Sequence, residues 1–201
     1  MLWNQMTVRV AALFALVGTI ALSPAAARAE EELVDNPQYQ SWSGHKPGTV
    51  VTSDMQTAMG GFNMTMVMTQ KLASIDEKEA VVEITTKMTG PGVPPGAGQP
   101  PAQKQTIKAK VTKAEAERSK LPPGMTGEMK EVSSEKIEAA GKSYDCKVVE
   151  FSGKNEMGDM KGKIWNTQEI PGAVAKMEST GEASGQAMKI TLTVKSIEEG
   201  K

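Results

Sequence analysis

Cysteine and histidine each occur once in this chain of 201 residues, as Cys146 and His45. A single cysteine cannot form an internal disulfide, and one cysteine with one histidine is not the cluster of ligands that a zinc site needs. A serine hydrolase would have to use His45, and the chain lacks the G-x-S-x-G motif. Cys146 alternates with Tyr144 and Val148, so we expect it to point inward, without the cationic setting that activates a thiol. We therefore expect no enzyme, no metal site and no cofactor.

Aromatic residues are also scarce, at 4% of the chain, whereas methionine occurs 14 times. Two of the methionines, Met1 and Met6, precede the predicted mature start, which leaves 12 in the mature protein. Methionine is flexible and polarisable, so it fills irregular space and adapts to different neighbours. This composition predicts a softer core than Phe and Ile would form, and it suits a cavity that accepts variable apolar chains.

Long apolar runs are absent, since none approaches the about 20 residues that cross a bilayer. The longest run, Val10–Leu22, follows Arg9 and precedes Ala27–Ala29, where small residues at alternate positions suit signal peptidase. Met1–Ala29 is therefore predicted to be a signal peptide. The mature protein is expected to begin near Glu30 and to be periplasmic or secreted, without a transmembrane segment.

Neither sign of charge dominates, with 23 basic and 24 acidic residues in the chain. Nucleic acids and anionic membrane surfaces are recognised by clustered positive charge, so the composition gives no reason to expect either as a partner. Residues 30–201 are long enough to bury one core and are predicted to form a single domain. Within it, residues 90–102 are rich in proline and glycine and are expected to form a flexible loop, because proline cannot donate to a strand ladder.

Apolar and polar residues alternate along much of the predicted mature chain, most clearly in Phe62–Ile75. A period of two is typical of strands with one buried face. Further strands are expected at residues 49–58, 80–89, 103–111, 127–138, 143–152, 160–166, 173–180 and 187–197, and short helices at residues 36–42 and 113–120. Turns suited to hairpins separate the strands, and no connecting helix is long enough for a parallel pair. We expect a mainly β fold: a single strongly curved antiparallel sheet of about 8–10 strands, a half-barrel or open barrel, with one or two short helices.

Both expected helices have start signals. Asn36 followed by Pro37 combines a preferred N-cap with proline at the first helical position. Thr112 and Glu115 match a capping box, in which each side chain accepts a hydrogen bond from the backbone N–H of the other. The helix at residues 113–120 is highly charged and lies between strands, which fits either a solvated connector or a lid over the sheet.

A short motif in the second half of the chain, G-x-x-Y-x-C-K followed by a strand with Ile-Trp, consists of Gly141, Tyr144, Cys146, Lys147 and Trp165. Over about residues 135–176 it resembles uncharacterised exported bacterial proteins that are grouped with lipoprotein-carrier-like half-barrels, the fold of the periplasmic lipoprotein chaperone. The resemblance implies a strongly curved antiparallel sheet with helices over its concave face. The arginine that the chaperones use inside their cavity has no counterpart here, so the resemblance implies a fold and no function.

Met64, Met66 and Met68 share one face of the strand at residues 62–75, about 7 Å apart. Three interpretations remain open: core packing, the wall of an adaptable apolar cavity, and a Cu(I) site. For copper, Met88 or Met188 would have to converge from another strand, because a single Cu(I) ion needs its sulfur ligands close together. The predicted cavity lining consists of Phe62, Met64, Met66, Met68, Ile84, Met88, Tyr144, Cys146, Ile164 and Met188.

Two functions from different classes follow from these patterns. One is an exported, non-enzymatic protein of the bacterial cell envelope that binds a lipid or other apolar ligand on the concave face of its sheet. The other is a structural or protein-interaction module with a filled core and no ligand, and the sequence indicates no particular protein partner. Methionine-based Cu(I) binding is a more remote alternative. Whether the concave face is open or filled separates the first two.

Overall fold

The structure is a computed structural model that describes residues 32–89, 100–122, 124–156, 158–183 and 185–201. The predicted signal peptide and most of the predicted loop at residues 90–102 lie outside the described residues. Residues Glu32–Lys201 form one compact unit. None of the helices in the described ranges is long and apolar enough to cross a bilayer.

Eleven strands and two short helices lie in the described part of the chain. The strands are β1 (Leu33–Asp35), β2 (Val50–Met59), β3 (Phe62–Ile75), β4 (Glu79–Thr89), β5 (Gln103–Lys108), β6 (Lys110–Thr112), β7 (Thr126–Ala139), β8 (Lys142–Asn155), β9 (Gly158–Asn166), β10 (Val174–Ala183) and β11 (Gln186–Glu198). The helices are α1 (Pro37–Ser43) and α2 (Lys113–Arg118). The predicted fold class is therefore confirmed, with strand Phe62–Ile75 at its predicted bounds.

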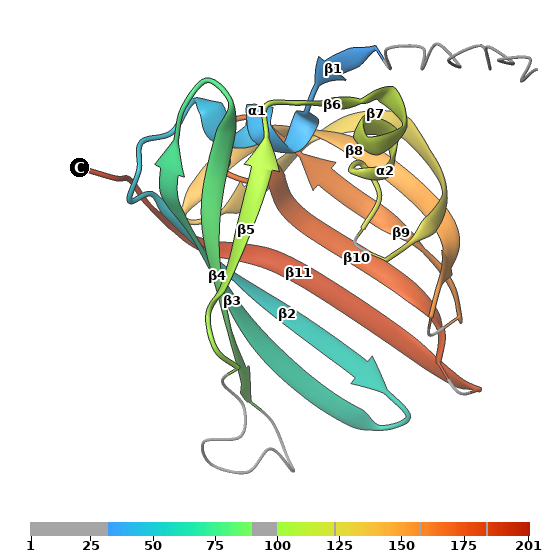
Figure 1. Cartoon of the computed structure of the whole chain (residues 1–201). Coiled ribbons are helices and arrows are strands. Elements are labelled where there is room, and N and C mark those ends of the chain that lie inside the picture. Colours follow the sequence, from blue (N-terminus) through green and yellow to red (C-terminus); the bar gives the residue numbers. More distant parts are fainter. Residues whose placement is uncertain (1–31, 90–99, 123, 157, 184) are drawn as a thin grey trace, which may run out of the picture. The chain divides into compact units, whose positions relative to one another are not determined.

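Nine strands form one antiparallel sheet in the order β5-β4-β3-β2-β11-β10-β9-β8-β7. Every pair of neighbours in this sheet is also consecutive in sequence except β2 and β11, which join the first half of the sheet to the second. The two end strands, β5 and β7, do not pair with each other, so the sheet is open. Figure 1 shows that the sheet is also curved. The sheet bends far enough for the Ala140 amide, in the β7–β8 turn, to donate a hydrogen bond to the Val194 carbonyl of β11 at 3.3 Å.

Four of the long strands carry a shift in register. The shifts lie around Ala73 in β3, Val132 in β7, Ala175 in β10 and Lys195 in β11. An extra residue in one strand of a pair bends that strand and increases its twist. These bulges account for much of the curvature, which the alternation of the sequence alone does not predict.

The strand predicted at residues 103–111 is divided in the structure into β5 and β6. The short strand β1, near the start of the described residues, was not predicted. The chain breaks at Ala109, whose carbonyl accepts a hydrogen bond from the Asn36 amide at 3.0 Å. After this break β6 leaves the large sheet and pairs with β1, with Leu33 opposite Thr112. Three-residue strands such as these are too short for alternation to predict them.

Both helices begin as the sequence predicts. The Asn36 side chain accepts a hydrogen bond from the Gln38 amide at 3.0 Å, and Trp42 of α1 is buried. At α2 the Thr112 amide donates to Glu115 at 2.9 Å and the Glu115 amide donates to the Thr112 hydroxyl at 3.2 Å. The predicted capping box is therefore present.

Buried apolar side chains form two separate clusters. We call the larger one the tryptophan cluster; it comprises Trp42, Val51, Leu72, Ala80, Val82, Ile107, Ala139, Tyr144, Cys146, Val148, Trp165, Ile170, Ala175 and Val194. We call the smaller one the methionine cluster; it comprises Met125, Phe151, Met160, Ile164, Ala183 and Met188, with Met59, Leu121, Met129, Val174, Met177 and Ile190 partly buried against it. The tryptophan cluster contains the most deeply buried side chains, so it is the main stabilising core.

Candidate functional site

One line of apolar side chains crosses six neighbouring strands, because the strand register places one from each strand directly opposite the next. The line, which we call the methionine row, consists of Met88, Met66, Met55, Leu192, Met177 and Ile164. Directly opposed residues of antiparallel strands project from the same face of the sheet. With strands about 4.8 Å apart, the five steps of the row span about 24 Å.

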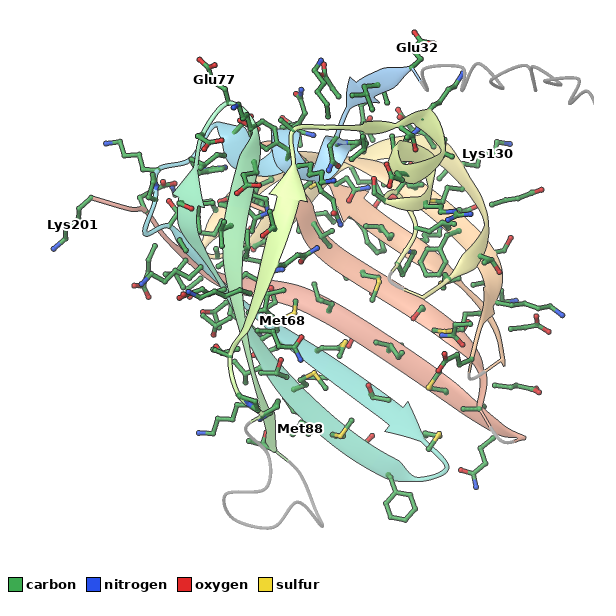
Figure 2. The ribbon with its side chains drawn as sticks, viewed as in Figure 1. Glu32, Met68, Glu77, Met88, Lys130 and Lys201 are labelled. Atoms are coloured by element: carbon green, nitrogen blue, oxygen red, sulfur yellow. The ribbon has the colours of Figure 1, made fainter. Side chains whose placement is uncertain are left out.

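The methionine row is neither a filled core nor a water-facing surface. Ile164, at one end, is 5% exposed and belongs to the methionine cluster. The other five residues, from Met88 to Met177, are half-buried. Figure 2 shows sulfur-containing side chains along β2, β3 and β11 on the side toward which the sheet curves, with Met68 and Met88 labelled. The row is thus an apolar surface that keeps part of its area accessible.

The structure distributes the predicted lining residues over four places. Half-buried positions on β3 and β4 hold Met64, Met66, Met68, Ile84 and Met88. The methionine cluster holds Ile164 and Met188, whereas the tryptophan cluster holds Tyr144 and Cys146. Phe62 stands apart next to the Gly60–Gly61 turn, where its side chain is 76% exposed.

Tyr144 and Cys146 lie apart from the methionines because they occupy a different stretch of β8. Together with Val148 they are buried in the tryptophan cluster, whereas Phe151, further along the same strand, lies in the methionine cluster. Burial is also the main cause that raises the pKa of the Cys146 thiol, with a further contribution from the nearby Asp145 carboxylate. Such a thiol is not activated for chemistry.

Three members of the row were not among the predicted lining residues: Met55, Met177 and Leu192. Each lies in a segment predicted to be a strand, but alternation within a strand does not say which strands are neighbours. For Leu192 and Met177 the missing information is the pairing of β2 with β11 and of β11 with β10.

A parallel line of residues beside the methionine row contains an unpaired hydroxyl. In this line Phe151, Gly162, Ser179 and Ile190 lie opposite one another on β8, β9, β10 and β11. Ser179 is 3% exposed, and its Oγ is the one buried side-chain polar atom of the described residues that has no hydrogen-bond partner. Buried hydroxyls usually have a partner, so the Ser179 hydroxyl is an exception among the described residues.

The segment that follows α2 covers part of this face. Met125 belongs to the methionine cluster and Leu121 packs against it. The Met125 amide donates a hydrogen bond to the Pro122 carbonyl at 3.1 Å. The helix itself contacts β1 and β6. The part of the α2 region that reaches the candidate face is therefore the stretch after the helix.

A groove of about 670 Å³ on the described residues carries seven charged side chains among its thirteen lining residues. Its walls include the charged residues Glu128, Lys130, Glu150, Lys163 and Glu178, and it also reaches Phe151, Gly162 and Ser179. Lys163 forms an ion pair with Glu150 at 3.1 Å. Mixed and partly paired charges on an exposed face are what solvated sheet surfaces ordinarily carry. We therefore place the candidate site on the methionine row, which offers apolar contact, and not in this groove.

Groups for acid–base or metal chemistry are dispersed. Among the described residues, no three His, Cys, Asp or Glu side chains are grouped as metal ligands. His45 lies 3.9 Å from Glu199, measured from Nδ1 to a carboxylate oxygen, and both residues lie outside the strands. The accessible chemistry of this site is apolar contact and thioether sulfur.

Comparison with known proteins gives no family model and no curated relative that matches the chain. Among solved structures, a protein assigned as exported, with a YmcC-like fold, from Bacteroides fragilis is 9% identical with a TM-score of 0.47, covering 77% of this chain and 97% of that chain. A protein assigned as a lipoprotein from Parabacteroides distasonis is 12% identical with a TM-score of 0.46, covering 77% and 96%. A DUF1329 family protein from Desulfovibrio piger is 7% identical with a TM-score of 0.28, covering 81% and 90%. These similarities do not assign the chain to a family.

Proposed function

We propose that this protein is an exported, non-enzymatic protein of the bacterial cell envelope that binds a single acyl chain along the methionine row. The predicted signal peptide supports export, and cleavage near Ala29 would release Glu30–Lys201. The observation that carries the ligand proposal is the half-burial of five consecutive members of the row, which leaves apolar surface accessible.

The dimensions of the row suit this ligand. A lipid acyl chain spans about half of the roughly 30 Å hydrocarbon core of a bilayer. The row is about 24 Å long, so one chain fits along it with room to spare. Methionine side chains adapt to ligands of different length and shape, which favours a site for variable acyl chains over one shaped for a single rigid molecule.

A polar anchor for the ligand lies beside the row. The Ser179 hydroxyl has no partner among the described residues. An ester or carboxyl group carries oxygen acceptors that this hydroxyl could satisfy, and a buried donor without a partner costs about 1–3 kcal/mol. Binding of an acyl ester would therefore offset a cost that the free protein bears.

Replacing Met66 by lysine is expected to leave the protein folded and to weaken acyl-chain binding at least tenfold. Met66 is half-buried and lies between Met88 and Met55 in the row. A lysine there can extend its ammonium toward water in the free protein, but a bound acyl chain would cover it and desolvate the charge. Binding is measured by displacement of a fluorescent fatty acid, and folding by circular dichroism and thermal unfolding.

Thr65→Lys is the matched control, because Thr65 is the preceding residue of β3 and projects from the opposite face, between Gln56 and Thr89. It should bind the fatty acid as the wild type does. If Met66→Lys unfolds the protein, the face is a filled core and the structural alternative stands. A wild-type protein that carries no lipid when it is purified from host membranes and analysed by native mass spectrometry would also contradict the proposal.

A further inference from the structure

The strand register surrounds Met66 with four other thioethers. Met55 on β2 and Met88 on β4 lie directly opposite Met66 on its two sides. Met64 and Met68 lie two residues away along β3 on the same face. Five methionines from three neighbouring strands therefore share one patch of the sheet.

Three of these sulfurs lie within reach of one another. Directly opposed residues of antiparallel strands have Cβ atoms about 4.5–5.5 Å apart. The methionine side chain has three rotatable bonds beyond Cα, so Met55 and Met88 can each lean toward Met66 without movement of the backbone. Spacing along a single strand, at about 7 Å, brings sulfurs together less readily than pairing across strands does.

The chemistry of this patch selects a soft monovalent cation. Thioether sulfur is neutral and polarisable, and it prefers Cu(I) to Mg²⁺, Ca²⁺ or Zn²⁺. The nearest position on β2 with a carboxylate, Asp54, has the opposite strand parity to Met55, and Lys87 has the opposite parity to Met88. These charged side chains therefore project from the other face, which disfavours hard divalent ions that require charged oxygen ligands.

We infer that Met55, Met66 and Met88 form a Cu(I) site with three thioether ligands from three adjacent strands. The half-burial of all three side chains leaves a path for the ion from solvent. Binding involves no change in oxidation state, because the ion enters and leaves as Cu(I). This inference does not depend on the proposed acyl-chain function, although the two ligands would use overlapping parts of the methionine row.

The test uses the protein purified in the form that its host cell produces. This protein is titrated anaerobically with Cu(I) in competition with a chromogenic Cu(I) chelator. The wild type is expected to bind one Cu(I) per chain, and Met66→Leu to bind it at least tenfold more weakly. Leucine has nearly the volume and apolarity of methionine, and such exchanges usually cost less than about 1.5 kcal/mol of stability, so the variant folds. It should also keep its affinity for fatty acid, which separates this inference from the acyl-chain proposal.

Met177→Leu is the matched control. Met177 lies in the same row, but the residues directly opposite it are Leu192 and Ile164, so no methionine is paired with it across the strands. Its substitution should leave Cu(I) affinity unchanged. Equal affinity of wild type and Met66→Leu overturns the site, as does an equal loss in both variants. Loss of binding in Cys146→Ala also overturns it, because the ion would then be held at the buried thiol.

Discussion

Replacing Leu72 by alanine is expected to lower the free energy of unfolding by about 3 kcal/mol. Leu72 is fully buried in the tryptophan cluster and lies opposite Val82. Removing its outer methyl groups loses their burial and leaves a cavity, which the close-packed neighbours fill only in part. The midpoint of thermal unfolding should fall by roughly 10 °C for a domain of this size.

The backbone at Leu72 limits how far the cavity can collapse. Its amide donates a hydrogen bond to the Thr49 carbonyl at 2.9 Å, and its carbonyl accepts one from the Gly48 amide at 2.7 Å. These bonds fix β3 to the segment before β2, next to the register shift at Ala73. The strand therefore cannot shift inward to fill the space, which keeps the cost above the lower end of the usual range for such substitutions, about 2 kcal/mol.

Urea unfolding followed by tryptophan fluorescence measures this effect, since Trp42 and Trp165 lie in the same cluster. Leu33→Ala is the control, because Leu33 is 60% exposed on β1 and its truncation should change stability by less than about 0.5 kcal/mol. Equal stability of the two variants would mean that the tryptophan cluster is not the main core.

Alternation and turn chemistry predict most of the fold because both are local. The bounds of Phe62–Ile75 follow from its period of two and from the preceding Gly60–Gly61 turn, at which both glycines have positive φ. The capping box at Thr112 follows from two residues three apart. In each case the physical cause lies within a few residues of its effect.

One contact of the candidate site also follows from the sequence. A two-residue turn at Gly60–Gly61 places Met59 opposite Phe62, and continuing that register places Met55 opposite Met66. The pairing of Met66 with Met88 is different, because the register shift at Ala73 intervenes between the β3–β4 turn and Met66. A bulge has no reliable signal in this sequence, so the third thioether could be placed only in three dimensions.

The remaining difference between the prediction from the sequence and the structure concerns which strands are neighbours in the sheet. Pairing of β2 with β11 joins residues far apart in sequence, and it connects Met55 to Leu192 and thereby to Met177. Local propensity does not encode such a pairing, since it results from the burial of the whole sheet face. The same limitation explains why the sequence predicts a single cavity for Tyr144, Cys146 and the methionines, whereas the structure places Tyr144 and Cys146 in the tryptophan cluster.

Replacing Gly162 by valine is expected to destabilise the protein by about 3 kcal/mol, at the upper end of the usual cost of overpacking. A Cβ atom at Gly162 would lie 2.7 Å from Cζ of Phe151 and 2.8 Å from Cα of Ser179, and it would overlap the Glu178 carbonyl oxygen. The Phe151 ring can rotate away, but the two backbone atoms belong to β10, which pairs with β9 along this stretch. Relief of the overlap therefore requires part of the β9–β10 ladder to separate.

The glycine also explains how the Phe151 ring packs in the methionine cluster, since the ring covers the surface that a side chain at residue 162 would occupy. Gly44→Val is the control, because a Cβ at Gly44 meets no atom within 4 Å and the φ of −82° suits any residue. Urea unfolding should show near-wild-type stability for Gly44→Val and a large loss for Gly162→Val. Phe151→Ala combined with Gly162→Val should restore little stability, since two of the three close contacts are with backbone; full recovery would show that the ring alone requires glycine at this position.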